Sequence, residues 1–154
     1  MTQVLIALSY WLHAVATVVF IGYFVLLAGI FLPALTRAQN GAALSEISKR
    51  SRPWMYVSLL LFLITGTYLT LVDPNYLGIG NFSNFWAVMM LVKHLLIGVM
   101  IALGFWFNAV LRIGPLMSSN TGAEQAITRF RNYVNAMAVC GVLVLLLTAL
   151  AQVE

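Results

Sequence analysis

Four stretches of the chain are each long and apolar enough to cross a lipid bilayer, and this pattern limits the fold more than any other feature. They cover residues 4–35, 54–72, 85–111 and 133–153. A spanning helix needs about 20 predominantly apolar residues, because each residue adds about 1.5 Å of length. The first and third stretches exceed this, so we expect them to tilt or to project beyond the membrane. The predicted fold class is an all-α integral membrane four-helix bundle.

The composition excludes a soluble globular domain. Of the 154 residues, 62% are hydrophobic and 8% are charged, whereas a soluble domain carries about 25% charged residues. A chain of this length has too much surface to bury such an excess of apolar side chains. We therefore expect residues 1–154 to form a single domain with lipid as its solvent. The first stretch lacks a basic n-region and a small-residue cleavage site, so we expect a retained helix.

The basic residues predict the orientation in the membrane. Seven of the eight Lys and Arg residues lie in the connections after the first and third stretches. None lies in the N-terminus, in segment 73–84 or at the C-terminus. The seven residues in the connections are Arg37, Lys49, Arg50, Arg52, Arg112, Arg129 and Arg131. The positive-inside rule then places both termini outside, in a bacterial inner membrane. The net charge of +4 indicates contact with anionic lipid, and nucleic acid is excluded as a partner.

The connections predict how the helices are arranged. Segment 41–52 mixes apolar and charged residues, as a short helix at the inner surface would, and Pro53 suits the first turn of the second span. We expect Gly114-Pro115 to end the third span, and residues 118–122 to form a turn before a polar, helical lead-in to the fourth. Short connections favour an up-down-up-down bundle. In such a bundle the first and third spans run in the same direction and lie diagonally opposite each other.

His13 and His94 are the main candidates for a functional site. An ionisable residue inside a bilayer is costly and indicates function by default. Each histidine lies about nine residues after the start of its stretch, which is ~14 Å deep at 1.5 Å per residue. Two imidazoles at one depth on diagonal helices can ligate haem iron from both faces. The alternatives are hydrogen bonding of each histidine across helices or a proton relay.

Small residues lie near the same depth. Gly98 is four residues after His94, and Thr65-Gly66 and Gly141 reach a comparable level on the other helices. They would let a flat porphyrin approach the backbones. Small residues equally permit close helix packing in membranes, so this feature does not separate the two interpretations.

Haem is favoured over zinc, because no Cys, Asp or Glu accompanies the two histidines. Copper is the alternative metal, since Met90 lies one turn before His94, and a thioether with an imidazole suits Cu(I). Lys93 points about 100° away from His94. Its ammonium can snorkel outward, or it can pair with a haem propionate or an anionic substrate.

No side chain is predicted to be catalytic. The chain shows no nucleophile–base pair and no phosphate loop, and its four acidic residues lie outside the apolar stretches. Hydrolytic chemistry is therefore not expected. If the protein is an enzyme, we expect a haem-dependent membrane oxidoreductase in which the cofactor performs the chemistry.

The first stretch resembles the CopD-type copper-resistance membrane domain. The similarity is carried by His13, by the step from Phe20 to Gly22 and by the Leu-Pro-x-Leu end at 32–35. The second stretch is similar at Thr65-Gly66, and the third at Lys93 and Asn108. The family usually has Trp where this chain has Phe20, and its members are often longer. The resemblance implies copper handling or haem-linked electron transfer.

The same residues also look like HemJ, the membrane protoporphyrinogen oxidase. There, a histidine of the first helix and a lysine of the third would correspond to His13 and Lys93. The arginine-rich end of the first helix in HemJ is missing here. This similarity implies porphyrinogen oxidation.

Together these features predict a CopD-like membrane protein that binds haem b through His13 and His94, with Lys93, Gly66 and Gly98 lining the site. The expected activity is electron transfer between a quinol, or a larger membrane redox complex, and an outer acceptor. The alternatives are copper transport or resistance with Met90 as a further ligand, porphyrinogen oxidation, and a non-catalytic accessory subunit of a larger membrane complex.

Overall fold

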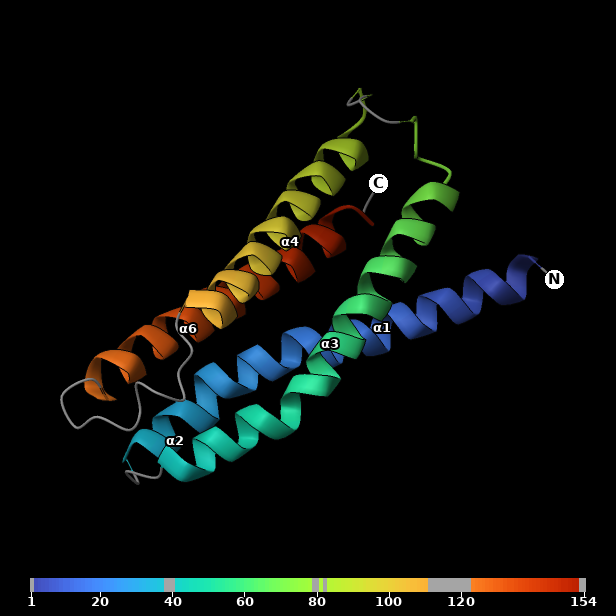
Figure 1. The fold of residues 1–154 in the computed structure, drawn as a ribbon. Helices are drawn as coiled ribbons and strands as arrows, with labels where there is room; N and C mark the ends of the chain where they lie inside the picture. Colours follow the sequence, from blue (N-terminus) through green and yellow to red (C-terminus); the bar gives the residue numbers. More distant parts are fainter. Residues whose placement is uncertain (1, 38–40, 79–80, 82, 111–122, 153–154) are drawn as a thin grey trace.

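A computed structural model describes residues 2–37, 41–78, 81, 83–110 and 123–152, and within these ranges the chain is helical without strands. The first rod consists of α1 (Thr2–Leu26), the π-helical turn η1 (Leu27–Phe31) and α2 (Leu32–Arg37). It is followed by α3 (Gly41–Val72), α4 (Phe85–Val110) and α6 (Ala123–Leu150), as shown in Figure 1.

Four helices of the described chain are long and apolar enough to cross a membrane. The segments with this property are Gln3–Arg37, Glu46–Val72, Phe85–Trp106 and Ile127–Leu150. The predicted all-helical architecture with four candidate spans is therefore confirmed. The predicted end at Gly114-Pro115 and the turn at 118–122 lie outside the described residues. The polar lead-in to the fourth span is helical, because α6 begins at Ala123.

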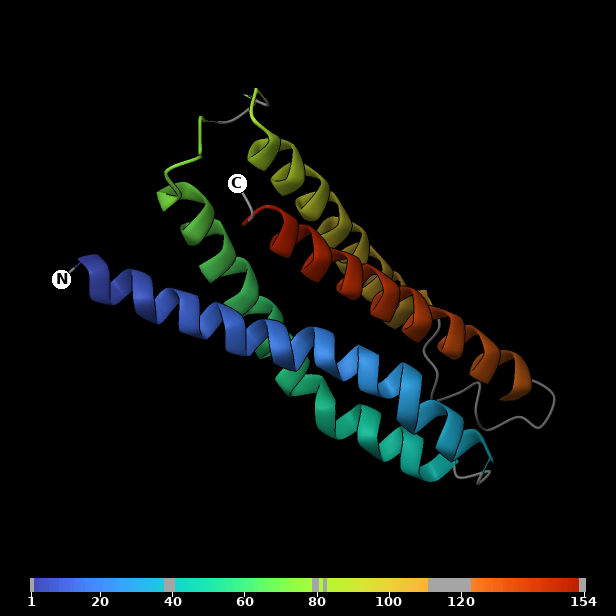
Figure 2. The same ribbon diagram turned by 180° about the vertical axis from the view of Figure 1, so that it is seen from behind.

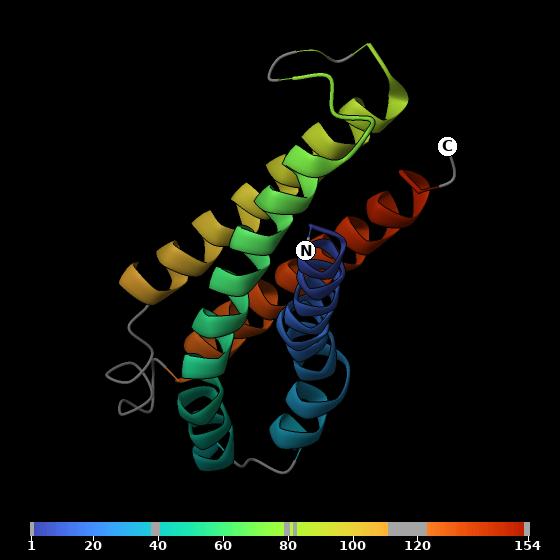
Figure 3. The same ribbon diagram turned by 90° about the vertical axis from the view of Figure 1, so that its right-hand side faces the viewer.

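The prediction of a separate inner-surface helix before Pro53 is wrong. The structure has one continuous helix, α3, with Pro53 in its interior. The residues before Pro53 include Ala, Leu, Glu, Lys and Arg, which favour a helix and extend it. Proline removes one backbone hydrogen bond and crowds the preceding turn, and this bends a helix more readily than it ends one. Figures 1 and 3 show that α3 changes direction partway along its length.

A π-helical turn interrupts the first rod, a feature that the sequence patterns did not predict. The backbone N–H of Leu32 donates to the carbonyl of Leu27, five residues earlier. The next residue is Pro33, which lacks an N–H and whose ring would crowd the carbonyl of Gly29 in a regular α-helix. A widened turn relieves this crowding, so the helix continues through Pro33 to Arg37.

The helices pack as two pairs joined through α1 and α6. Extensive contacts link α1 with α3, α4 with α6, and α1 with α6. Figures 1 and 2 show α4 lying along α6, while α3 crosses α1. α4 has no comparably extensive contact with α1 or α3 among the described residues. Only 6% of the apolar stretch of α4 that could cross a membrane is buried. Most of the surface of α4 is therefore left for lipid or ligands.

Aromatic rings form the centre of the core. Phe62 of α3 stacks on His13 and faces Phe20, with centroid distances of 4.8 and 6.3 Å. The series continues from Phe20 to Phe24 and on to Tyr133 of α6. In a membrane, helices associate through such close packing, because lipid is as apolar as the side chains. A separate small cluster of Trp86, Ala87 and Ala151 joins the start of α4 to the end of α6.

Candidate functional site: two histidines with free Nε2 atoms

His13 lies between α1 and α3 and is half-buried. Its Nδ1 is 2.9 Å from the Oγ1 of Thr65. Its ring stacks on Phe62 with an interplanar angle of 20°. The ring is therefore held on one face and at one nitrogen by α3.

The partners of Thr65 determine which nitrogen of His13 carries the proton. The Thr65 hydroxyl has a single proton, and it donates this proton to the carbonyl of Leu61 at 2.5 Å. With the hydroxyl used in this way, its oxygen accepts a hydrogen bond from the Nδ1–H of His13, and a further hydrogen bond joins the His13 ring to the backbone of Phe62. In the neutral imidazole, Nε2 is left with a free lone pair. A hydrogen bond at the other ring nitrogen is the usual support of a metal-ligating histidine.

Gly66 provides the space for this ring. A Cβ placed on Gly66 would lie 2.9 Å from the Cε1 of His13, closer than van der Waals contact allows. The small residue predicted to admit a porphyrin thus admits the His13 ring itself. Gly98, the other predicted contact, has nothing within 4 Å of such a Cβ, and it lies on the exposed face of α4.

Lys93 of α4 is half-buried. Its positive charge acts on His13 of α1 and on Asp73 at the end of α3. The lysine is therefore close enough to both to interact electrostatically across the space between three helices. The side chain of Asn108, the other polar residue of the resemblance on this helix, lies outside the described residues.

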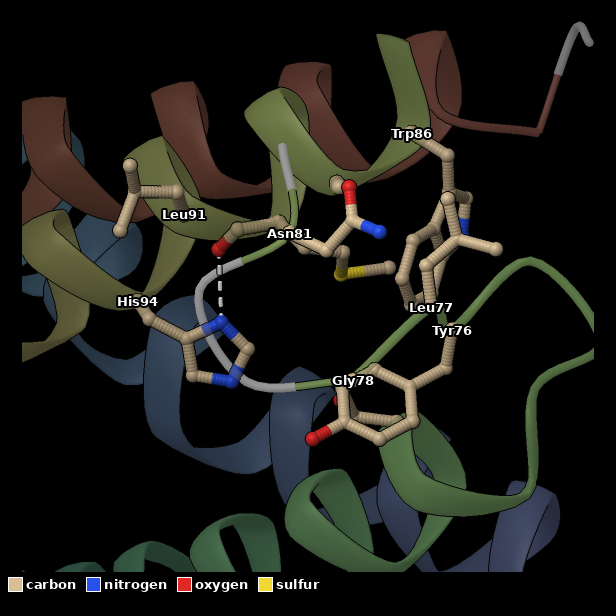
Figure 4. Close-up of a pocket in the computed structure, with 10 residues that line it drawn as sticks. Tyr76, Leu77, Gly78, Asn81, Trp86, Leu91 and His94 are labelled. Carbon is tan, nitrogen blue, oxygen red and sulfur yellow. Dashed lines mark hydrogen bonds between the residues drawn. The ribbon is translucent and has the colours of Figure 1, made fainter. Parts of the chain in front are cut away.

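His94 has different surroundings. It is exposed, and its Nδ1 lies 2.6 Å from the carbonyl oxygen of Met90, one turn earlier in α4. A carbonyl can only accept a hydrogen bond, so Nδ1 must carry the proton. The neutral ring again presents a bare Nε2. Figure 4 shows this edge of the ring turned towards Tyr76 and Gly78.

A cavity of about 360 Å³ lies beside His94, between the end of α3, residues 76–78 and 81, and the start of α4. Two aromatic side chains, Tyr76 and Trp86, form part of its wall (Figure 4). Its other lining residues are the polar Thr70, Asn81 and His94, together with Leu77, Gly78, Ala87, Met90 and Leu91. The sequence patterns did not predict this cavity, because its wall comes from a connection of irregular backbone.

Hydrogen bonds join residues 73–75 to the start of α4 next to the cavity. The Asn84 side chain caps α4 by accepting from the N–H of Ala87 at 2.8 Å, and it donates to the carbonyl of Asn75 at 3.0 Å. Asp73 accepts from the N–H of Asn75. Gly78 has a φ of 102°, a conformation that glycine adopts without steric cost.

The two histidines thus belong to two sites. The contacts described for His13 join it to α3, and those for His94 join it to its own helix and to the cavity. No described hydrogen bond or ring contact links the two imidazoles. Their shared ligation of one iron stays a prediction.

Comparisons with protein-family models, with curated proteins and with solved structures found no match to this chain.

Proposed function

We propose that this protein is a CopD-like multi-pass membrane protein that binds b-type haem and transfers electrons, with His13 as an axial ligand. The observation that carries this assignment is the hydrogen bond between Nδ1 of His13 and Thr65, because a hydrogen bond at Nδ1 is the usual support of a histidine that binds metal through Nε2. Stacking on Phe62 orients the ring. An imidazole held in this way matches the proximal ligands of haem proteins.

The residues around His13 fit haem by their donor chemistry. Bound haem would supply a one-electron ferric/ferrous couple. Thr65 would keep the His13 ring in the ligating tautomer, and Lys93 would supply a positive charge near an anionic propionate. In the bis-histidine form of the site, the Nε2 of His94 would also hold the haem iron. In the other form, His13 is the protein ligand and His94 serves the cavity.

The optical spectrum of the purified protein tests this function. Protein purified in detergent, or reconstituted with haem, should show a Soret band and an α-band on reduction. His13→Ala should remove both, whereas Leu95→Ala, at an exposed position one residue after His94, should keep them. A wild-type protein that takes up no haem under these conditions would contradict the assignment.

For the membrane topology, we propose an up-down-up-down bundle with both termini and segment 73–84 outside a bacterial inner membrane. The distribution of Lys and Arg supports this orientation. In Figure 1, the end of α3 and the end of α6 lie towards one end of the molecule and α2 lies at the other. A single cysteine introduced at Ser83 of a Cys140→Ala chain should react with an impermeant thiol reagent in intact cells, and one at Ser48 should not.

Porphyrinogen oxidation is a second candidate function. The electrostatic interaction between His13 and Lys93 supports it, since these are the two positions of the similarity to HemJ. Membranes containing the protein should then convert protoporphyrinogen to fluorescent protoporphyrin, and Lys93→Met should abolish this conversion. Fluorescence that rises equally with and without the protein would exclude this activity.

A further inference from the structure

We infer that the cavity beside His94 binds the ring of a lipid-soluble hydroquinone, with the Nε2 of His94 accepting a hydrogen bond from a ring hydroxyl. Hydroquinone binding does not depend on haem. Only the role of the hydroquinone as the source of electrons rests on the proposed function.

The size and walls of the cavity suit one aromatic ring. Its volume of about 360 Å³ lies within the range of about 300–1,000 Å³ that is usual for small-molecule sites. Tyr76 and Trp86 supply aromatic surface from two sides (Figure 4), and Leu77 and Met90 supply apolar surface. Flat ligands with few polar atoms bind favourably against such walls.

The two hydrogen-bond acceptors of the cavity, His94 and Thr70, favour the reduced form of the ligand. The Nδ1–H of His94 is engaged by the Met90 carbonyl, so its neutral ring offers only an acceptor to the cavity. The Thr70 hydroxyl donates to the carbonyl of Gly66, so its oxygen is also an acceptor. A hydroquinone has hydroxyl groups that can donate to both. A quinone has only carbonyl oxygens, which can accept from the donors of Tyr76, Asn81 or Trp86 in the lining but cannot pair with His94 or Thr70.

The charges around the cavity argue against an anionic ligand. The ten residues of the described chain that line it are uncharged side chains or glycine when His94 is neutral. Lys93, the nearest residue along the helix, is not among them. A phosphate or carboxylate would therefore lose its hydration without gaining an opposite charge.

The cavity opens at its side, and hydrogen bonds join residues 73–75 to the start of α4 next to it. Leu77, Leu91 and His94 all keep exposed surface, so a ligand dissolved in lipid can reach it from the side. The bonds of Asn84 to Ala87 and Asn75 fix the outer wall. A wall that is ordered before binding reduces the entropy lost when the ligand binds.

A binding titration with both redox forms of one compound tests this inference. Full-length protein in lipid nanodiscs would be titrated with decylubiquinol and with decylubiquinone, with intrinsic tryptophan fluorescence as the signal. We expect the quinol to bind more tightly, by about fivefold or more for one hydrogen bond of ordinary strength. Equal affinity for the two forms, or tighter binding of the quinone, would overturn the proposal.

Variants of α4 separate a ligand contact from general packing. His94→Phe keeps an aromatic ring and removes one of the two acceptors, so it should weaken quinol binding and leave quinone binding unchanged. Leu95→Phe, outside the cavity lining, should leave the preference for quinol intact. Because His94 is exposed, we expect the variant to fold, and its elution as a monodisperse species checks this. A preference for quinol as large in His94→Phe as in the wild type would refute the role of Nε2.

The same samples distinguish failure of this inference from failure of the proposed function. A preference for quinol in a protein that takes up no haem supports the cavity ligand and contradicts haem binding. Loss of the haem bands in His94→Phe makes His94 an iron ligand and overturns its role here. Stoichiometric Cu(I) binding that needs both Met90 and His94 and displaces the quinol makes the cavity a metal site, and it overturns the inference as well.

Discussion

Gly66 and the His13 ring fit against each other so closely that a Cβ on Gly66 would lie 2.9 Å from Cε1 of the imidazole. The glycine of α3 and the histidine of α1 therefore form one packing unit. Thr65, the preceding residue, holds the same ring by its Nδ1. The Thr-Gly step of α3 thus has two separate effects on His13, one through a hydrogen bond and one through space.

Substitution of Gly66 should displace His13. We expect Gly66→Ala to destabilise the protein by about 1–3 kcal/mol, the usual cost of overpacking, and to weaken haem uptake. Unfolding with SDS in mixed micelles measures the stability. Gly98→Ala is the matched control: nothing lies within 4 Å of its added Cβ, so it should be neutral or stabilising by up to about 1 kcal/mol. Equal losses in both variants would show that His13 does not limit position 66.

Removal of the Thr65 hydroxyl should allow the ring proton of His13 to move between its two nitrogens. In the wild type, ¹⁵N spectra of labelled histidine should show the Nδ1–H tautomer at His13. Thr65→Val leaves the Nδ1–H without its acceptor, which should give a mixture of tautomers and cost about 1–3 kcal/mol. Thr65→Ser keeps a hydroxyl and should retain the wild-type spectrum. A wild-type ring protonated at Nε2 would contradict the assignment and, with it, the observation that carries the proposed function.

The contact between Gly141 of α6 and Ile21 of α1 should be equally sensitive. A Cβ on Gly141 would meet Cγ2 of Ile21 at 2.7 Å. Gly141→Ala should therefore destabilise the protein by about 1–3 kcal/mol. Ile21→Ala removes the clashing carbon, so the double variant should lose less than the sum of the two single variants. Additive losses in a double-mutant cycle would show that the two residues are not in contact.

Asn84 should matter for both the start of α4 and the cavity. Asn84→Ala removes the cap of Ala87 and the bond to Asn75, and it should cost about 1 kcal/mol of stability. It should also weaken quinol binding, because the outer wall loses its order. Asn84→Asp keeps the capping oxygen and loses only the donor, so its stability should remain near that of the wild type. Quinol affinity unchanged in Asn84→Ala would show that this wall contributes nothing to binding.

The two proline-containing positions show where local patterns mislead. Pro53 suggested a helix start, and the structure has it inside α3. Pro33 follows a π-helical turn that keeps the first rod continuous. The residues on either side of each proline form helix. The helix continues past the missing hydrogen bond by bending at Pro53 and by widening one turn before Pro33, and a pattern of apolar residues does not reveal either change.

The sequence by itself determined that the chain is helical, that it has four segments able to span a membrane, and that histidines at positions 13 and 94 are its main polar groups within them. These properties follow from length, hydropathy and residue type, which are local. Only the tertiary structure decided that His13 packs on Phe62 and Gly66 while His94 lines a cavity with Tyr76 and Trp86. Equal depth in the membrane leaves the rotation of each helix open, and side-chain packing between helices determines that rotation.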